Sequence, residues 1–226
     1  MTLKRKIITT ADGSSSIQIE EWNEQYHSKH GAIQEAQHVF IQNGFNKIKN
    51  IHKTISILEI GFGTGLNCFL TLIEAQKHLV NIQYTGIEKY PITQKEWEAL
   101  NYLSKIKNGS LFEKEYSLLF HQNWEIPQHI TPTFSLTKKK LDFFDIPYNY
   151  QYDLIYFDAF GFRVQPDLWN QKMFDHMYQL TAKNGILITY AAKGSVRRAM
   201  IQSGFKIERL PGPPGKREML RAQKLR

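Results

Sequence analysis

The pattern of hydrophobic and polar residues predicts two elements near the N-terminus. The segment Thr9–Ile19 combines a DG turn signal with alternating residues, which predicts a β-hairpin. In Tyr26–Asn43 the apolar residues recur at helical spacing. This second pattern predicts a helix with one buried face, formed by Ala32, Ala36, Val39 and Phe40.

From residue 51 onward, strand-like and helix-like segments alternate. The predicted strands are residues 55–60, 82–88, a piece within 133–144, 152–160, 185–191, 205–212 and 218–224. The predicted helices are residues 66–79, 91–100, a segment after Pro166, and 193–204. Pro91 is placed to open its helix, where proline is tolerated. Residues 101–132 are helical and aromatic in character, but Pro127 and Pro132 interrupt them.

Alternating strands and helices predict an α/β fold, with a parallel sheet covered by helices on both faces. The last two strands are joined by the short loop PGPPGKR, so we expect them to pair antiparallel. We predict a single structural unit over residues 51–226, and a hairpin-and-helix extension over residues 1–50 that packs on it. In such sheets, ligands bind at the carboxyl ends of the strands.

Composition and charge narrow the classes of partner. The chain has 226 residues, 42% of them hydrophobic, and a net charge of +8, which permits a polyanionic partner. Its single cysteine, Cys68, excludes an intramolecular disulfide and a cysteine-cage metal site, and fits a reducing cytoplasm. The eight histidines show no metal-ligand spacing, so no metal is predicted. No signal peptide and no apolar run of about 18 residues is present, so no membrane contact is predicted.

Three glycines stand at alternate positions where the first strand of this alternating region meets its helix. Gly61, Gly63 and Gly65 lie in LEIGFGTGLN, and glycine lets the backbone turn tightly or approach a ligand closely. The alternative is a turn that only packs helix on strand. The dinucleotide fingerprint G-x-G-x-x-G is not matched, because residue 66 is leucine, and no phosphate-binding G-K-[ST] follows.

Three acidic residues stand at or near the ends of predicted strands. Glu88 lies where an acid accepts both hydroxyls of a ribose, or it is a surface acid at a strand end. Asp142 is placed to accept from an adenine amino group, or it is a turn or capping residue. Asp158 ends a run too apolar for an unpaired charge, which makes it the best candidate for a catalytic or substrate-holding acid. Its alternative is a cap on the following turn.

Together these residues resemble the class I S-adenosylmethionine-dependent methyltransferases. The match lies in E-x-G-x-G-x-G, an acid after the second strand and an aspartate after the fourth. More narrowly, LEIGFGTGLN, YFDAFGFRVQPDLW and GKREMLRA resemble the methyltransferase half of the MnmC family, which modifies the wobble uridine of bacterial tRNA. The likeness covers nearly the whole chain. It implies a Rossmann-like sheet of seven strands, one of them antiparallel.

The resemblance implies an N-methyltransferase that converts 5-aminomethyl-2-thiouridine in tRNA to 5-methylaminomethyl-2-thiouridine. It implies S-adenosyl-L-methionine as cofactor and a tRNA anticodon stem-loop as partner. The implied cofactor contacts are Glu59, Gly61, Gly63, Gly65, Asn67, Glu88, Asp142, Tyr26 and Glu35. Asp158 would face the aminomethyl group, either as the base or only to orient the amine. The chain ends at Arg226 without a second glycine fingerprint, so we expect it not to bind FAD.

The basic C-terminal segment offers contacts for tRNA phosphates. The candidates are Arg197, Arg198, Lys216 and Arg217. The alternative for Lys216 and Arg217 is that the final loop folds back and shapes the active site.

Three other functions compete with this one. The first is a methyltransferase of the same fold that acts on a small amine or a protein. The second is an NAD-dependent oxidoreductase, which the glycine spacing and the final hairpin disfavour. The third is a non-catalytic nucleic-acid-binding module, which the glycines, Glu88 and Asp158 together disfavour.

Overall fold

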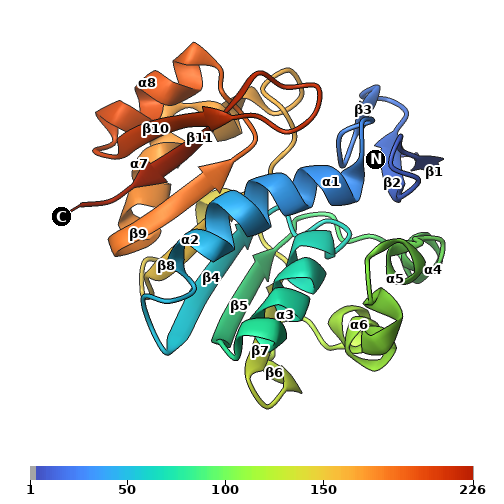
Figure 1. The fold of residues 1–226 in the computed structure, drawn as a ribbon. Coiled ribbons are helices and arrows are strands. Elements are labelled where there is room, and N and C mark those ends of the chain that lie inside the picture. Colours follow the sequence, from blue (N-terminus) through green and yellow to red (C-terminus); the bar gives the residue numbers. More distant parts are fainter. Residues whose placement is uncertain (1–3, 226) are drawn as a thin grey trace.

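The computed structural model describes residues 4–225 and contains one large sheet flanked by helices (Figure 1). The strands of this sheet are β4 Thr54–Ile60, β5 Asn81–Ile87, β6 Gln128–Thr131, β7 Phe134–Lys139, β8 Tyr152–Phe157, β9 Thr181–Thr189, β10 Lys206–Pro211 and β11 Glu218–Gln223. They lie in the order β10-β11-β9-β8-β4-β5-β7-β6. Strands β7, β5, β4, β8 and β9 run parallel. The predicted α/β fold with a mostly parallel sheet is confirmed.

The strand order reverses at β4. The chain moves from β4 outward to β5 and β7, then returns to the other side of β4 for β8 and β9. This switch point leaves the carboxyl ends of β4 and β8 side by side, with helices on opposite faces. A crevice at such a place is the usual ligand site of open α/β sheets.

The sheet has eight strands, not the expected seven, and two of them are antiparallel. Strand β11 pairs antiparallel with both β9 and β10, as expected for the final hairpin. The additional strand is β6, which pairs antiparallel with β7 at the sheet edge. Strand β6 has only four residues and lies between Pro127 and Pro132. Four residues are too few to show the alternation of apolar and polar side chains that predicts a strand.

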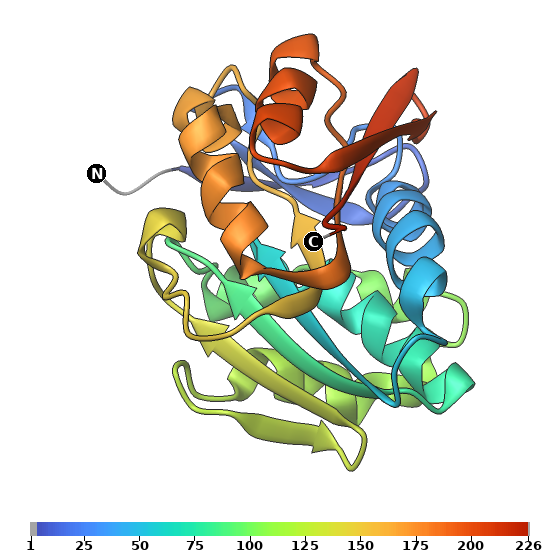
Figure 2. The ribbon, with the colours of Figure 1, turned by 90° about the vertical axis from the view of Figure 1, so that its left-hand side faces the viewer.

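Helices cover both faces of the sheet (Figure 2). The principal helices are α3 Leu66–His78, α4 Gln94–Glu98, α5 Tyr102–Lys105, α6 Glu113–His121, α7 Gln171–Leu180 and α8 Gly194–Gln202. Short 3₁₀ turns are η2 Gly109–Phe112, η3 Phe143–Asp145 and η4 Pro166–Trp169. Successive β4 side chains point to opposite faces, so Ile57 joins the core under α3 and Leu58 the core under α7 and α8.

The N-terminal region forms the predicted hairpin and a long helix. Strands β1 Arg5–Thr9, β2 Ser15–Ile19 and β3 Glu24–Gln25 make a small antiparallel sheet. The helix comprises α1 Ala32–Ala36, a π-helical part η1 Gln37–Phe45 and α2 Asn46–Ile48, and it crosses one face of the large sheet (Figure 1). All four residues of its predicted buried face are buried. This helix shares a hydrophobic core with α3 and the sheet. The predicted division between an N-terminal extension, residues 1–50, and the unit of residues 51–226 stays a prediction.

The long helix begins six residues later than predicted, because its start is set by a tertiary contact. The hairpin residue Asp12 accepts the backbone N–H of Gln34 at 3.0 Å, and Thr10 accepts that of Ala32 at 3.2 Å. A side chain at Gly31 would collide with Asp12. Side chains from another element therefore cap the helix N-terminus, a role that a local residue usually fills.

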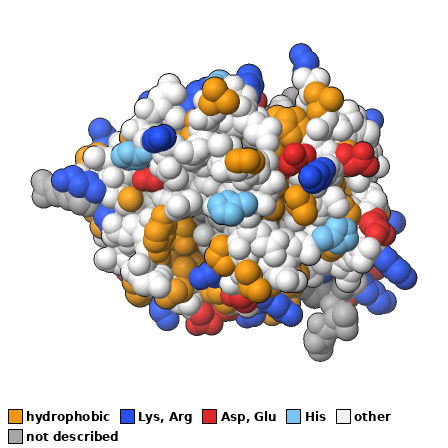
Figure 3. All heavy atoms as spheres, turned by 90° about the horizontal axis from the view of Figure 1, so that it is seen from below, with side chains coloured by type: hydrophobic (Ala, Val, Ile, Leu, Met, Phe, Trp, Pro, Cys, Tyr) orange, Lys and Arg blue, Asp and Glu red, His pale blue; other side chains and the backbone are white. Residues whose placement is uncertain are grey.

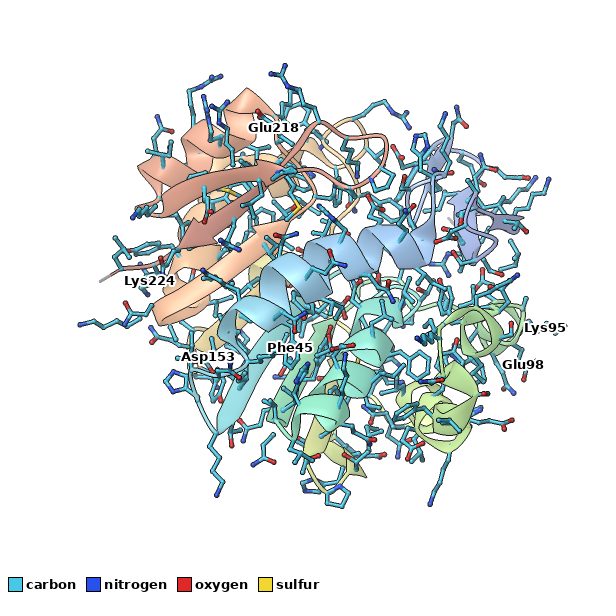
Figure 4. All side chains as sticks on the ribbon, viewed as in Figure 1. Phe45, Lys95, Glu98, Asp153, Glu218 and Lys224 are labelled. Atoms are coloured by element: carbon cyan, nitrogen blue, oxygen red, sulfur yellow. The ribbon has the colours of Figure 1, made fainter. Side chains whose placement is uncertain are left out.

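Helix α4 also begins later than predicted. Thr93, not Pro91, precedes it, and Thr93 and Glu96 form a reciprocal capping box. The outer face of this short helix is polar: Lys95 and Glu98 are exposed there and point away from the protein (Figure 4).

The surface seen from below the view of Figure 1 carries cations, acids and apolar groups interspersed (Figure 3). Between residues 4 and 225, no helix has the length and apolar character needed to cross a membrane.

Candidate active site

A cavity of about 980 Å³ lies at the carboxyl ends of β4, β5 and β8. Its wall comes from the glycine turn after β4, the residues that follow β5 and β8, the N-terminal segment 18–30 and the loop between β10 and β11. This volume is near the upper end of the range of about 300–1,000 Å³ typical of small-molecule sites. Segments far apart in the sequence thus meet around one space.

The three glycines of the turn all have positive φ angles, of 86°, 51° and 75°. A Cβ atom on Gly61 would lie 2.6 Å from the backbone oxygen of Asp158, and one on Gly63 would lie 3.1 Å from the Tyr26 ring. Gly61 and Gly63 line the cavity, whereas Gly65 precedes α3 outside the cavity wall. Glycine is therefore required here by backbone conformation and by the protein's own packing.

Glu88 follows β5 directly and lies in the cavity wall. Its Oε2 accepts the backbone N–H of Gly63 at 3.0 Å, and its Oε1 accepts that of Tyr90 at 2.8 Å. Burial raises the pKa of Glu88, and these N–H donors oppose the rise. The carboxylate is thereby held beside the glycine turn, where each oxygen keeps a second lone pair.

Asp142 also lies in the cavity wall. Its Oδ1 caps η3 by accepting the N–H of Phe144, and its Oδ2 accepts from Lys89 Nζ at 2.7 Å. Burial would raise its pKa, but the hydrogen bonds from Lys89 and Phe144 outweigh burial, so the pKa is lowered. Asp142 therefore both caps a turn and lines the cavity, so the two roles that were predicted as alternatives are combined in one residue.

Asp158 follows β8 and faces the cavity. Its Oδ2 accepts from Asn67 Nδ2 at 2.8 Å. Burial, and then the negative charge of Glu35, raise the pKa of Asp158 to about 7, against the Asn67 hydrogen bond and the positive charge of Lys216. This carboxylate changes protonation near neutral pH, as a general base or acid requires.

Glu59 lies beneath the cavity, not in its wall. Its Oε1 accepts from the same Asn67 Nδ2 at 2.9 Å, and its Oε2 accepts from Tyr84 OH at 2.8 Å. Burial raises the pKa of Glu59 well above its usual range. Asn67 itself does line the cavity, so it connects Glu59 below with Asp158 above.

The N-terminal segment and the final loop meet over the cavity. Lys216 Nζ lies 2.6 Å from Glu35 Oε1, and Glu35 Oε2 accepts the N–H of Ser28 at 2.7 Å. The Lys216 ammonium also lies 3.7 Å from the centre of the Tyr190 ring. Tyr26 packs edge-on against Phe160 with ring centres 5.0 Å apart. Of the two alternatives for Lys216, its position favours shaping the site.

The other predicted phosphate contacts lie apart from this cavity. Arg197 and Arg198 lie on α8, and Arg217 borders a second, neighbouring cavity. Within residues 4–225, no group of three or more histidine, cysteine or acidic side chains is placed to hold a metal ion.

Several cavity residues were missed by sequence reasoning. Tyr190 follows β9, and the rule that ligands sit at strand ends was sufficient to find it. His27 contacts Thr64 at 3.4 Å, and burial lowers the pKa of His27 to about 4, so it is neutral at pH 7. Lys89 lines the cavity and donates a hydrogen bond to Asp142. Neither His27 nor Lys89 belongs to a hydrophobic pattern or motif that would have predicted its position.

Comparison with known proteins shows similarity to one family of enzymes. Residues 120–225 match a family described as S-adenosyl-L-methionine-dependent methyltransferase. The chain is 30% identical over 210 residues to the tRNA 5-methylaminomethyl-2-thiouridine biosynthesis bifunctional protein MnmC of Hydrogenovibrio crunogenus, covering 86% of this chain and 30% of that protein. The C-terminal part of the chain is therefore similar to the S-adenosyl-L-methionine-dependent methyltransferase family, and most of the chain is similar to one part of an MnmC protein.

Two further proteins show the same similarity. MnmC of Leptospira interrogans is 29% identical over 213 residues, covering 89% of this chain and 32% of that protein. The structure of MNMC2 from Aquifex aeolicus superposes with a TM-score of 0.80 at 23% identity, over 100% of this chain and 71% of that one, which shows the shared fold. The chain thus spans about a third of the length of the curated relatives it matches. The description of the matching family implies S-adenosyl-L-methionine as the cofactor.

Proposed function

We propose that this methyltransferase converts 5-aminomethyl-2-thiouridine in tRNA to 5-methylaminomethyl-2-thiouridine. The observation that carries the proposal is a carboxylate with a pKa of about 7, Asp158, in a cavity beside the glycine turn. The choice of substrate is supported by the similarity to MnmC proteins, whose name refers to the biosynthesis of 5-methylaminomethyl-2-thiouridine in tRNA. The net charge of +8 suits a polyanionic partner such as tRNA.

The cavity residues fit the methyl donor. The Oδ1 atom of Asn67 is buried at the cavity wall and has no hydrogen-bond partner among residues 4–225. A lone acceptor of this kind fits the α-ammonium group of a methionine moiety, since an unpaired buried polar atom is costly. Glu88 would hold the ribose hydroxyls and Asp142 would lie by the adenine. Gly61 and Gly63 would border the methionine part.

S-adenosyl-L-methionine supplies a methyl group activated by its bond to a sulfonium. The protein must position an amine whose nitrogen has a free lone pair. A primary amine with a pKa of about 10 is mostly protonated at neutral pH. We assign Asp158 as the base that takes this proton, directly or through water, because its pKa of about 7 matches the working pH. Its hydrogen bond to Asn67 also holds the carboxylate in place to orient the amine.

Glu59 and Gly65 would act indirectly in this site. Glu59 would hold Asn67 from beneath, and Gly65 would set the start of α3. Tyr26 and Glu35 would close the cofactor end of the cavity from the N-terminal extension. A tRNA substrate and the single buried cysteine suit a cytoplasmic location, which we propose for the protein.

The test is to incubate the protein with methyl-labelled S-adenosyl-L-methionine and tRNA from cells that accumulate 5-aminomethyl-2-thiouridine. The tRNA is then digested and the labelled nucleoside identified. We expect label in 5-methylaminomethyl-2-thiouridine, and a much slower rate of labelling with Asp158→Asn. No label from the wild-type protein, with cofactor binding shown by calorimetry, would reject the tRNA substrate, and label on spermidine or a protein would support a different acceptor.

A further inference from the structure

A second cavity, of about 550 Å³, adjoins the first. Gly161, Tyr190 and Lys216 line both cavities, so they form a shared wall. Tyr190 OH donates to the backbone oxygen of Ala159 at 2.8 Å, next to Asp158. The second cavity therefore lies behind a wall whose Tyr190 is bound to the residue after Asp158.

The second cavity is rich in cations. Its lining includes Lys193, Arg209, Lys216 and Arg217, with the single acid Glu218. Glu218, labelled in Figure 4 where β11 begins, pairs with Arg209 at 3.5 Å, and Lys216 pairs with Glu35 in the first cavity. Lys193 and Arg217 are exposed and form no ion pair or side-chain hydrogen bond within residues 4–225. Two uncompensated cations at one cavity favour a ligand with negative charge.

An exposed aromatic ring lies beside these cations. Phe162 is 39% exposed, and Lys193 Nζ lies 3.4 Å from the centre of its ring. A single exposed apolar side chain is ordinary by itself, so Phe162 supports a site only together with the cations beside it. A flat aromatic face together with two cations matches the chemistry of single-stranded nucleic-acid binding, in which bases stack and phosphates pair with cations.

We propose that the second cavity holds an RNA nucleotide next to the methyl acceptor, with its base on Phe162 and its phosphate on Lys193 and Arg217. This inference rests on the proposed tRNA substrate. The first cavity is large enough for the methyl donor and an acceptor base, so the flanking nucleotide is the part that needs a further site. The acceptor would then reach Asp158 alongside Tyr190 and Lys216.

The test measures binding of a fluorescent anticodon stem-loop RNA by anisotropy at several salt concentrations. We expect Lys193→Ala with Arg217→Ala to raise Kd at least about tenfold, and to reduce the slope of log K against log salt by about 0.7 for each lost phosphate contact. The matched control is Lys183→Ala with Lys206→Ala, which removes the same charge from exposed positions outside both cavities. The control pair is expected to leave Kd nearly unchanged.

The aromatic contact has its own signature. Phe162→Ala should raise Kd by about 5- to 150-fold with an unchanged salt slope, because stacking releases no counterions. Phe162→Trp keeps an aromatic ring at this position, so it should bind the RNA about as tightly as the wild-type protein. Affinity for S-adenosyl-L-methionine should be the same in every variant.

The outcomes separate the two proposals. Cavity variants that bind RNA as tightly as the control pair, or a wild-type protein that binds no RNA, would overturn the inference. If the cavity variants weaken RNA binding as expected but the wild-type protein methylates no tRNA, the second cavity is supported as an RNA site and the proposed reaction is rejected.

Discussion

The two sides of the main cavity are built in different ways. On one side, Gly61, Gly63 and Asn67 lie within a single short stretch of chain, from the turn after β4 to the first turn of α3. On the other side, Glu35 and Lys216 meet although 181 positions separate them. The first side depends on local backbone conformation, whereas the second exists only when the N-terminal segment and the last loop are both in place. We therefore expect substitutions on the glycine side to damage the fold, and substitutions on the other side to alter chemistry.

The largest effect is expected from Gly61→Ala. The backbone φ of 86° is unfavourable for alanine, and the added carbon would lie 2.6 Å from the backbone oxygen of Asp158. We expect a loss of at least about 2 kcal/mol in the free energy of unfolding, together with loss of cofactor binding. Urea titration and calorimetry measure these. The matched control is Gly194→Ala, where the nearest atom is the flexible end of Arg198, and an equal loss there would contradict the argument.

The next largest effect is expected from Asp158→Asn. The amide cannot take the amine proton, so kcat should fall by about 100-fold or more, as for loss of a general base. Affinity for S-adenosyl-L-methionine should change little. Asp167→Asn alters an exposed acid of the same cavity and should retain turnover. Near-normal turnover by Asp158→Asn would remove Asp158 from the mechanism.

A third, intermediate effect concerns the pH dependence of turnover. Because Asp158 must be ionised to act as a base, kcat should rise with pH through about 7. Glu35→Gln removes a negative charge that raises this pKa, so the rising limb should move to lower pH. Lys216→Met removes the opposing positive charge, so the limb should move to higher pH. Shifts in the same direction, or none, in pH–rate profiles would show that these residues do not act on Asp158 by charge.

The smallest effect is expected for the ion pair between Glu35 and Lys216 as a stabilising contact. The Lys216 side chain is 33% exposed, so solvent weakens the attraction. A double-mutant cycle with Glu35→Gln and Lys216→Met should give a coupling of about 1 kcal/mol in the free energy of unfolding. A coupling several times larger would mean that the contact between the two chain ends supports the fold itself.

Sequence reasoning succeeded where periodicity was strong. The run of buried residues in β8 and the turn-linked pair β10 and β11 were found because apolar patterns and short loops are local signals. It failed for β6, which is short and lies between prolines, and for the start of α1, where Asp12 of the hairpin supplies the cap. A helix boundary that is set by a distant side chain leaves no mark in its own sequence.

The same division holds for the site. The acids Glu88, Asp142 and Asp158 were expected at strand ends, and all three lie in one cavity, because parallel strands place their carboxyl ends at one edge. The sequence did not predict which polar side chains lie in the cavity wall and which lie beneath it. Glu59 and Asn67 are both near the glycine turn, yet only Asn67 reaches the cavity.

The chain's order of residues was sufficient for the α/β fold, the tight glycine turn and the carboxylates at the strand ends, since each depends on neighbours in the sequence. The three-dimensional arrangement alone decided the pKa of Asp158, the pairing of Lys216 with Glu35 and the second, cationic cavity. Burial and charge act through space, and the groups that set them here come from segments more than a hundred residues apart.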